Sequence, residues 1–390
     1  MKKLILFISM LLGPYLIYGQ TVTPPVITQQ KFDSTMTELQ SQVQQQILIY
    51  LQAYQKQVDS YFKVITFQPP KPVYNFTMPG ALASKAISYS NLNGTPSSYK
   101  LISGLSFDQK GDSVTCISLS NCNYVHITLC RFTNTRAFSV DIENCTNVIV
   151  DSCFITNVAQ GPMAQNSKSI QFINNQVLNI NGNALWKGHA FNFNNVSGTR
   201  NLINNNKIEN IAGVAKYPHD MISVISCNPS DTLYVIGNWI RGGQINYRPK
   251  MIASSDGATG IALGDGTGSK QVARNNILVN PAGSGFQTVG SGTGIVYDHN
   301  IVYIKLPANS LINPIGVSVQ DNQPVYVGYN RVLVYRLNGL TTMNTRPIND
   351  GLPSFWNSPT SPTPIAWNTN KWQDLTLNEN ILPQTIITYK

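Results

Sequence analysis

The feature that most constrains the fold of this chain is an internal repeat whose shortest step is 22–23 residues. Residues 121–134, NCNYVHITLCRFTN, align with residues 144–157, NCTNVIVDSCFITN, and share both cysteines. Further copies begin at residues 166 and 197, and weaker ones continue to residue 382. About 22 residues accommodate three short strands at roughly 3.3 Å per residue, and longer steps allow loops at corners. The repeat therefore predicts a coiled strand solenoid.

One position runs through all of the copies and is most often asparagine. Asparagine tolerates the left-handed backbone that sharp corners between strands require, and stacked amides can bond to one another inside a core. The pattern predicts an asparagine ladder along one edge of the solenoid. Its predicted members are Cys130, Cys153, Asn175, Asn206, Asn238, Asn275, His299, Asn330 and Glu379.

These copies resemble the "N-x-I-x-N" coil repeat of the right-handed parallel β-helix proteins, the pectate-lyase-like superfamily, over about residues 110–385. The resemblance implies an all-β fold, a right-handed parallel β-helix (solenoid) of about nine or ten coils with an N-terminal amphipathic α-helix before it. The same fold serves lyases, hydrolases, epimerases, tailspikes and adhesins, so the resemblance implies an architecture and leaves the activity open.

The start of the chain has the pattern of a signal peptide over residues 1–19, with two lysines before a short apolar stretch. No later segment approaches the roughly 20 apolar residues that a membrane span requires, so no integral membrane segment is expected after signal removal. We expect a secreted, periplasmic or cell-surface protein. The predicted regions that follow are a leader and helix at 20–66, a Pro-rich linker into the solenoid at 67–97, and the β-helix domain at 98–390.

Residues 31–65 predict the amphipathic helix, because apolar residues recur at intervals of three or four from Leu39 to Tyr61. Two roles fit such a helix. It can cap the open end of the solenoid, or it can form a coiled coil that joins chains into a homo-oligomer.

The net charge of the chain indicates which class of molecule it is expected to bind. The formal net charge is +9, but only 12% of residues are charged, so the basic bias is weak. A weak positive bias favours an acidic polysaccharide as partner, although it also serves solubility. The chain has no lysine and arginine cluster of the kind that binds nucleic acid, so no nucleic acid is expected.

A second ladder, on another side of each coil, gathers the candidate catalytic residues. Its predicted stack is Phe138, Phe191, Met221, Ile261, Phe286 and Val317. His189 and His219 lie beside it, 30 residues apart, and are expected to meet on neighbouring coils together with Lys216 and Asp220. A histidine next to a carboxylate can act as a base, and a His/His/Asp set can hold a divalent metal. A polar corner that satisfies its own backbone is the structural alternative.

Candidate substrate-binding residues surround this stack, mostly on the inserted loop 241–260. Arginines there can neutralise a substrate carboxylate with two hydrogen bonds. No residue is assigned as a metal ligand. Ca²⁺ stays open as a cofactor, but Asp265 in the GDGTGS turn supplies too few ligands alone. The candidate substrate-binding residues are Lys187, Arg241, Tyr247, Arg248, Lys250 and Asp256.

Two functions fit these features, and the sequence leaves open whether the protein is an enzyme. The first is a polysaccharide lyase acting on a uronic-acid polymer. The second is a non-catalytic envelope or surface protein that binds glycan or acts as a structural β-helix. The segment KGHA at 187–190 lacks the second glycine of the Gly-His-Gly seen in polygalacturonase-like hydrolases, which argues against hydrolysis of that type.

The cysteines follow the repeat. Cys145 is expected above Cys122 and Cys153 above Cys130. Export would permit disulfides, and stacked coils bring Cα atoms into disulfide range. Parallel stacking, however, points the Cβ vectors the same way, so free and buried thiols are predicted.

Overall fold

The computed structural model describes residues 82–183, 185, 187–210, 219–242, 259–281, 284–306, 315–321, 323–336, 355–357 and 361–382. The predicted signal peptide, the leader and helix at 20–66, and the segment 31–65 proposed for oligomerisation lie outside the described residues. Among the residues that are described, no helix is long and apolar enough to cross a membrane.

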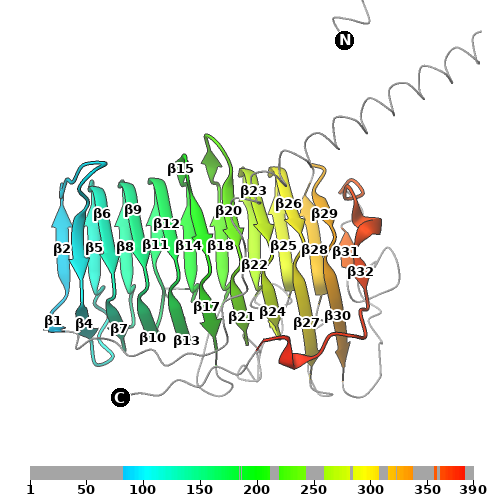
Figure 1. Ribbon diagram of the computed structural model, residues 1–390, viewed down its shortest axis with the longest axis horizontal. Helices are drawn as coiled ribbons and strands as arrows, with labels where there is room; N and C mark the ends of the chain where they lie inside the picture. The colour runs from blue at the N-terminus through cyan, green and yellow to red at the C-terminus, as the bar shows by residue number, and fades with distance from the viewer. Residues whose placement is uncertain are drawn as a thin grey trace, which may run out of the picture. The chain divides into compact units, whose positions relative to one another are not determined.

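Three long parallel sheets, A, B and C, form the described part of the chain, and the chain visits them in turn (Figure 1). Most circuits add one strand to each sheet, and two circuits add a second, short strand to sheet C. This is a parallel β-helix, and the predicted fold class and all-β solenoid are confirmed. β1 and β2 lie within 67–97, the segment predicted to lead into the solenoid.

Sheet A contains eleven strands. They are β1 (Leu82–Ser84), β4 (Leu105–Asp108), β7 (Arg131–Thr133), β10 (Phe154–Val158), β13 (Gln176–Ile180), β17 (Lys207–Glu209), β21 (Trp239–Arg241), β24 (Ile277–Val279), β27 (Ile301–Leu306), β30 (Arg331–Arg336) and β32 (Lys371–Trp372). Sheet B contains ten. They are β2 (Ile87–Ser90), β5 (Ile117–Ser120), β8 (Val140–Glu143), β11 (Met163–Gln165), β14 (Phe191–Asn194), β18 (Ile222–Ile225), β22 (Ile261–Gly266), β25 (Ser284–Gly290), β28 (Ile315–Asp321) and β31 (Phe355–Asn357).

Sheet C contains nine strands in one row and two short ones beside them. The row is β3 (Lys100–Ser103), β6 (Asn123–Thr128), β9 (Thr146–Asp151), β12 (Lys168–Ile173), β16 (Leu202–Asn204), β20 (Leu233–Ile236), β23 (Ser269–Arg274), β26 (Thr293–Asp298) and β29 (Tyr326–Gly328), and the short strands are β15 (Ser197–Gly198) and β19 (Asn228–Pro229). Two 3₁₀ turns near the C-terminus are η2 (Trp367–Thr369) and η3 (Glu379–Ile381).

The strands form because apolar and polar residues alternate with period two. In β6, Val125 and Ile127 are fully buried, while His126 between them is partly exposed. Val125 pairs with Val148 on the next coil, which is the 23-residue step of the repeat. Inward residues of all three sheets meet in one continuous core, so each coil is held by apolar packing against the coils on both sides.

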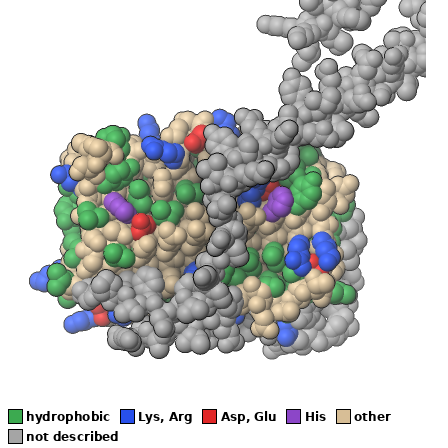
Figure 2. Space-filling model, in the orientation of Figure 1, with side chains coloured by type: hydrophobic (Ala, Val, Ile, Leu, Met, Phe, Trp, Pro, Cys, Tyr) green, Lys and Arg blue, Asp and Glu red, His purple; other side chains and the backbone are tan. Residues whose placement is uncertain are grey.

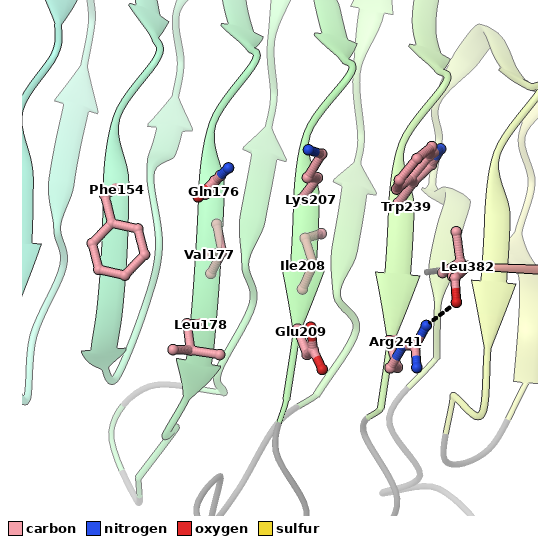
Figure 3. A pocket seen from close by; sticks show the side chains of 10 residues that line it. All are labelled: Phe154, Gln176, Val177, Leu178, Lys207, Ile208, Glu209, Trp239, Arg241 and Leu382. Carbon is pink, nitrogen blue, oxygen red and sulfur yellow. Dashed lines mark hydrogen bonds between the residues drawn. The ribbon is translucent and has the colours of Figure 1, made fainter. Parts of the chain in front are cut away.

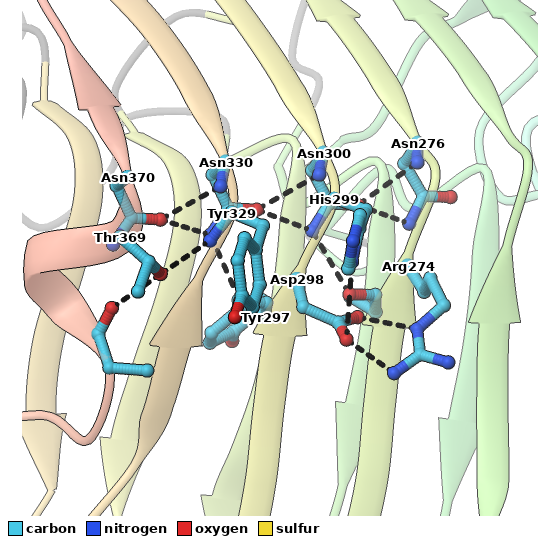
Figure 4. Close-up of polar contacts among 12 residues, drawn as sticks. Arg274, Asn276, Tyr297, Asp298, His299, Asn300, Tyr329, Asn330, Thr369 and Asn370 are labelled. Carbon is cyan, nitrogen blue, oxygen red and sulfur yellow. Dashed lines mark hydrogen bonds and ion pairs between the residues drawn. The ribbon is translucent and has the colours of Figure 1, made fainter. Parts of the chain in front are cut away.

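An asparagine ladder runs along the corner between sheets C and A, as predicted (Figure 4). Asn238 represents its geometry. Its Nδ2 donates to Asn276 Oδ1 at 3.0 Å and to the carbonyl of Ile203 at 2.9 Å, and its Oδ1 accepts from the backbone and side chain of Asn206, both at 3.0 Å. The ladder satisfies buried backbone groups that the corner would otherwise leave unpaired.

The members of the ladder differ from the prediction in its last coils. The ladder passes through Asn276, Asn300 and Asn370, and not through the predicted Asn275, His299 and Glu379. Asn275 and His299 instead have φ angles of 55° and 54°, so they make the left-handed corner just before the ladder residue. The corner and the ladder are therefore two adjacent positions, each of which favours asparagine for a different reason.

The six cysteines are all buried and free, as predicted. Cys145 Sγ lies 3.2 Å from the backbone nitrogen of Cys122, so the stacked thiols serve the corner as small hydrogen-bonding groups. Burial raises the pKa of the thiols of Cys116, Cys145 and Cys227 to about 12.

All six thiols are buried, so native protein is expected not to react with a thiol reagent such as dithionitrobenzoate, which cannot reach them. After unfolding in denaturant without reductant, all six thiols should react. Release of fewer chromophore equivalents from the unfolded chain would show a disulfide and contradict the structure.

Candidate functional site

The register between β14 and β18 brings the candidate catalytic residues together. Phe191 pairs with Ile222, so His189 and Asp220, each two residues earlier, lie opposite each other on neighbouring coils. The second predicted ladder placed Met221 beside Phe191, whereas the structure places Ile222 there, so the prediction is wrong by one residue in this coil. Phe138 also lies outside the ladder, because it bridges to Gln160.

His189, His219 and Asp220 form a compact cluster at the N-terminal ends of β14 and β18, two neighbouring strands of sheet B. Nδ1 of His219 lies 3.1 Å from Oδ2 of Asp220, and Nε2 of His189 lies 3.9 Å from the same oxygen. The two imidazole rings meet edge to face with centroids 5.3 Å apart. The side chains of His189 and Asp220 are 7% and 13% exposed, whereas that of His219 is 26% exposed, so His219 is the member that solvent reaches most.

Two amide side chains fix the ring of His189. Gln160 accepts the backbone N–H of His189 on Oε1 at 3.1 Å, which leaves its Nε2 to donate to His189 Nδ1 at 3.2 Å. Asn192 Nδ2 also lies 2.7 Å from Nδ1. Because Nδ1 accepts, the neutral ring carries its proton on Nε2, on the side of Asp220.

The pKa values of His189 and Asp220 are both lowered, which favours the neutral form of the histidine and the ionised form of the aspartate. Burial lowers the pKa of His189 to about 4, although the nearby Asp220 opposes this. Burial by itself would raise the pKa of Asp220, but the contact with His219 and the charges of both histidines outweigh it, and the pKa is lowered. At neutral pH the cluster therefore contains a neutral His189 beside an ionised Asp220.

Asp265 belongs to the same region, although the sequence suggested only a turn there. It lies on β22, next to β18 in sheet B. Burial and the charge of Asp220 raise the pKa of its carboxyl, while Lys187 and His219 act to lower it. Asp265 pairs with Ile225 at the C-terminal end of β18, whereas Asp220 precedes the N-terminal end, so Asp265 is an electrostatic neighbour of the cluster and not a member of it.

The cluster fits a divalent metal poorly. One atom from each of His189, His219 and Asp220 lies within 4.8 Å of the others, which is the spacing of metal ligands. The ring of His189, however, offers a protonated Nε2 to the cluster, and a neutral imidazole ligand must be unprotonated there. Calcium prefers six to eight oxygen ligands, and these three residues supply one carboxylate.

Two buried polar atoms next to the cluster have no hydrogen-bond partner. Oδ1 of Asn192 and Oγ of Ser223 are both unpaired, and the two residues are directly paired in the sheet on β14 and β18. Unpaired buried polar atoms are rare and costly, but both of these atoms are closed off from solvent, so they are part of the packing between the two coils. The sequence signal for Asn192 was its outward position between Phe191 and Phe193, and Gln160 gave no recognisable signal.

The other predicted site residues are distributed differently. Lys187 is exposed and acts on the pKa values of His189 and Asp265, so it belongs near the cluster. Arg241 is not brought there: it ends β21 in sheet A and donates to the carbonyl of Leu382. The remaining predicted residues lie outside the described residues; they are Lys216, Tyr247, Arg248, Lys250 and Asp256.

His189 should make the stability of the protein fall in acid. Its pKa is about 4 in the folded protein and about 6.5 in the unfolded chain, so below pH 6.5 the unfolded chain binds more protons. His189 leaves the stability independent of pH above about pH 6.5, and up to about 3 kcal/mol is lost as the pH falls from about 6.5 to about 4, below which the loss is complete. Chemical denaturation at a series of pH values measures this loss.

The control for this measurement is His189→Asn, whose side-chain oxygen can accept from Gln160 and Asn192 without titrating. The charged groups that act on His189 are Asp220, His219 and Lys187, and all of them remain in the variant. Equal loss of stability in acid for both proteins would contradict the assignment.

On the face seen in Figure 2, charged side chains and histidines are scattered among uncharged and hydrophobic ones and do not form one patch.

Comparisons with known proteins find structures of similar architecture. No family model matches the chain, and no curated protein matches it. An alginate lyase from Paenibacillus sp. str. FPU-7 has a TM-score of 0.40 and 13% identity, over 67% of this chain and 90% of that chain. The catalytic domain of a GH87 alpha-1,3-glucanase has a TM-score of 0.26 and 12% identity, over 75% of this chain and 65% of that chain. At these values the likeness is one of general architecture, so the function must be argued from the site.

Proposed function

We propose that the protein is an exported polysaccharide lyase that acts on an acidic, uronic-acid polymer, with His219 as the base. The observation that carries this proposal is the contact between His219 and Asp220, just before the N-terminal end of β18 in sheet B. Asp220 faces Nδ1 of His219, so Nε2 is left to take a proton from substrate. This is the arrangement in which a carboxylate fixes the tautomer of a catalytic histidine.

This role requires the contact to tighten. Nδ1 of His219 lies 3.1 Å from the carboxylate but is not aligned for a hydrogen bond. Catalytic pairs are often misaligned without substrate and tighten when it binds. Nε2 of His189 lies 3.9 Å from the same carboxylate oxygen of Asp220.

Elimination in a uronic-acid polymer requires three events. His219 Nε2 takes the proton from the carbon next to the carboxylate, and the electrons of that C–H bond form the double bond to the neighbouring carbon. The bond from that carbon to the glycosidic oxygen breaks, and the oxygen leaves with a proton. Solvent water supplies that proton.

The negative charge that develops on the substrate carboxylate also needs a cation. Lys187 is exposed and electrostatically coupled to the cluster, so it is suited to neutralise this charge. Lys216, Tyr247, Arg248, Lys250 and Asp256 remain predicted contributors.

The proposal is tested with purified protein and a panel of alginate, pectate and glycosaminoglycans. On at least one polymer we expect ultraviolet absorbance from the unsaturated uronate product, together with shortening of the chains. Absence of both signals on every polymer would refute the lyase assignment. Binding of a polymer without cleavage would favour the alternative, a non-catalytic surface protein that binds glycan.

A further inference from the structure

The outer face of sheet C carries an apolar row that takes no part in the proposed function. The members of the row pair in register from coil to coil, so they line up along the axis of the solenoid. All of them alternate with buried residues and are half-buried themselves, and four of the six are aliphatic. Outward positions of a solvent-facing strand are normally polar, so an apolar row of this length marks an interaction surface. The row consists of Ile149, Gln171, Leu202, Tyr234, Val272 and Val296.

A second outward row runs beside the first, two residues further along each strand. Ile173 and Ile236 add apolar surface, and Asn204 lies between them. Asp151 lies beyond Ile173, and Arg274 lies beyond Ile236. Outward residues of one strand are about 6.6 Å apart, so the two rows form one continuous surface.

This face is bounded by short connections. From β6 to β26, every connection from sheet B into sheet C and from sheet C to sheet A has two residues. The extra residues in this range, 199–201 and 230–232, lie within sheet C at the edge toward sheet B. Sheet A, by contrast, is partly covered by the chain itself, because Leu382 packs beside Trp239 and its carbonyl accepts from Arg241 (Figure 3). The face of sheet C therefore suits a large, flat partner.

The pattern of the first row is the same in both directions from β16. Leu202 lies at its centre. Gln171 and Tyr234 flank Leu202, and each has a polar group at the end of its side chain. Ile149 and Val272 come next, and both are β-branched. If two copies of the face met across a two-fold axis along β16, like side chains would face each other.

The second row has the same symmetry and adds charge complementarity. Asn204 lies at its centre, between Ile173 and Ile236. Asp151 and Arg274, which carry opposite charges, come next on the two sides. The same two-fold axis would place Asp151 opposite Arg274 twice. It would also place the amide of Asn204 opposite its own copy, where each amide offers both a donor and an acceptor.

We propose that the outer face of sheet C joins two copies of this chain in a dimer with two-fold symmetry, with the axis along β16. Ile173 then faces the partner's Ile236, and Asp151 faces the partner's Arg274. Nε of Arg274 donates to Asp298 of its own chain, so the contact with Asp151 extends an ion pair that already exists. The inference goes beyond the proposed function and does not depend on it.

The size of the face agrees with a stable dimer. Seven strands from β6 to β26 span about 34 Å, and strands of six residues are about 20 Å long, which gives about 700 Å² for each partner. A standard interface buries about 800 Å² of each partner. The His219 cluster lies before the N-terminal end of β18, at the edge of sheet B away from sheet C, so both copies keep it open.

The first test is sedimentation velocity of the full chain over a range of concentrations. We expect the unmodified protein to form a dimer. Leu202→Arg should raise the dissociation constant of the dimer about a hundredfold or more, because two arginines would meet at the two-fold axis and each dimer carries the change twice. The matched control is Leu185→Arg, at a position that is 78% exposed between β13 and β14, and it should leave the dissociation constant unchanged.

The second test locates the interface by cross-linking. The six native cysteines are buried, so a short bis-maleimide would reach only a cysteine introduced at the surface. Asn204→Cys places two thiols opposite each other at the axis, and we expect it to give covalent dimers. Glu143→Cys, at an exposed position on sheet B, should give none.

A protein that stays monomeric at every concentration would overturn the inference. A dimer that Leu202→Arg does not weaken, or that Asn204→Cys does not cross-link, would overturn it as well. Circular dichroism shows whether Leu202→Arg is folded, and the cross-linking decides if it is not. A monomer that binds an insoluble glycan and loses that binding in Leu202→Arg would assign the face to a glycan instead of a second copy.

Discussion

Replacement of His219 by alanine is expected to lower kcat for cleavage of the acidic polymer by about 10²- to 10⁴-fold, the usual contribution of a general base. The variant should fold normally, because His219 is partly exposed and lies outside the main core. Initial rates from the absorbance of the unsaturated product measure the effect. The decrease should appear in kcat more than in KM, since the base acts on the reacting proton and not on the bound polymer.

The chain provides a matched control for this variant. His126 on sheet C also faces an aspartate, with Nε2 3.0 Å from Asp151 Oδ2, but it is far from the cluster in the order of strands. His126→Ala should therefore leave kcat unchanged. Asp220→Asn should act like the His219 variant, because an amide no longer favours the required tautomer. Retention of full activity in either cluster variant would show that the base is elsewhere.

The asparagine ladder predicts the largest effect on stability. Asn238→Ala removes the bonds of Asn238 to Ile203, Asn206 and Asn276, and it leaves a buried carbonyl and a buried N–H without partners. At about 1–3 kcal/mol for each orphaned group, we expect the free energy of unfolding to fall by about 3–5 kcal/mol. Denaturant unfolding followed by circular dichroism measures this change.

Two further variants make the prediction specific. Asn238→Cys should cost less than alanine, because Cys130 and Cys153 occupy the same position in earlier coils and their thiols lie within bonding distance of backbone carbonyls. Asn228→Ala, at an exposed position, should change stability by no more than about 0.5 kcal/mol. If the alanine variants at 238 and 228 were equally stable, the ladder would not be a source of stability.

The solenoid could be predicted because apolar residues and asparagines recur in the sequence at intervals equal to the length of one coil. The ladder was harder to place, because the corner residue and the ladder residue are adjacent and both accept asparagine. At Asn275 and Asn276 the sequence offers two equivalent choices, and only the hydrogen bonds distinguish them. At the last coil the inserted residues lengthen the step, so Glu379 was chosen where Asn370 completes the ladder.

The meeting of His189, His219 and Asp220 also followed from the sequence, because a constant step places equivalent residues on neighbouring coils. Arg241 did not follow, since the sheet to which a residue belongs depends on where each strand begins and ends. Asp265 was missed as an electrostatic neighbour of the cluster for a related reason. Asp265 lies on β22, which pairs with β18, the strand that follows Asp220. The pairing contains a shift of register, and nothing in the residue pattern predicts that shift.

The side-chain amides of the ladder all point the same way: each Nδ2 faces the following coil and each Oδ1 faces the preceding one. Every interior coil therefore presents an acceptor on one side and a donor on the other, whatever its length. A coil could be duplicated or deleted during evolution without leaving any of these groups unpaired. The number of coils can therefore change while the hydrogen bonds at the corners are kept.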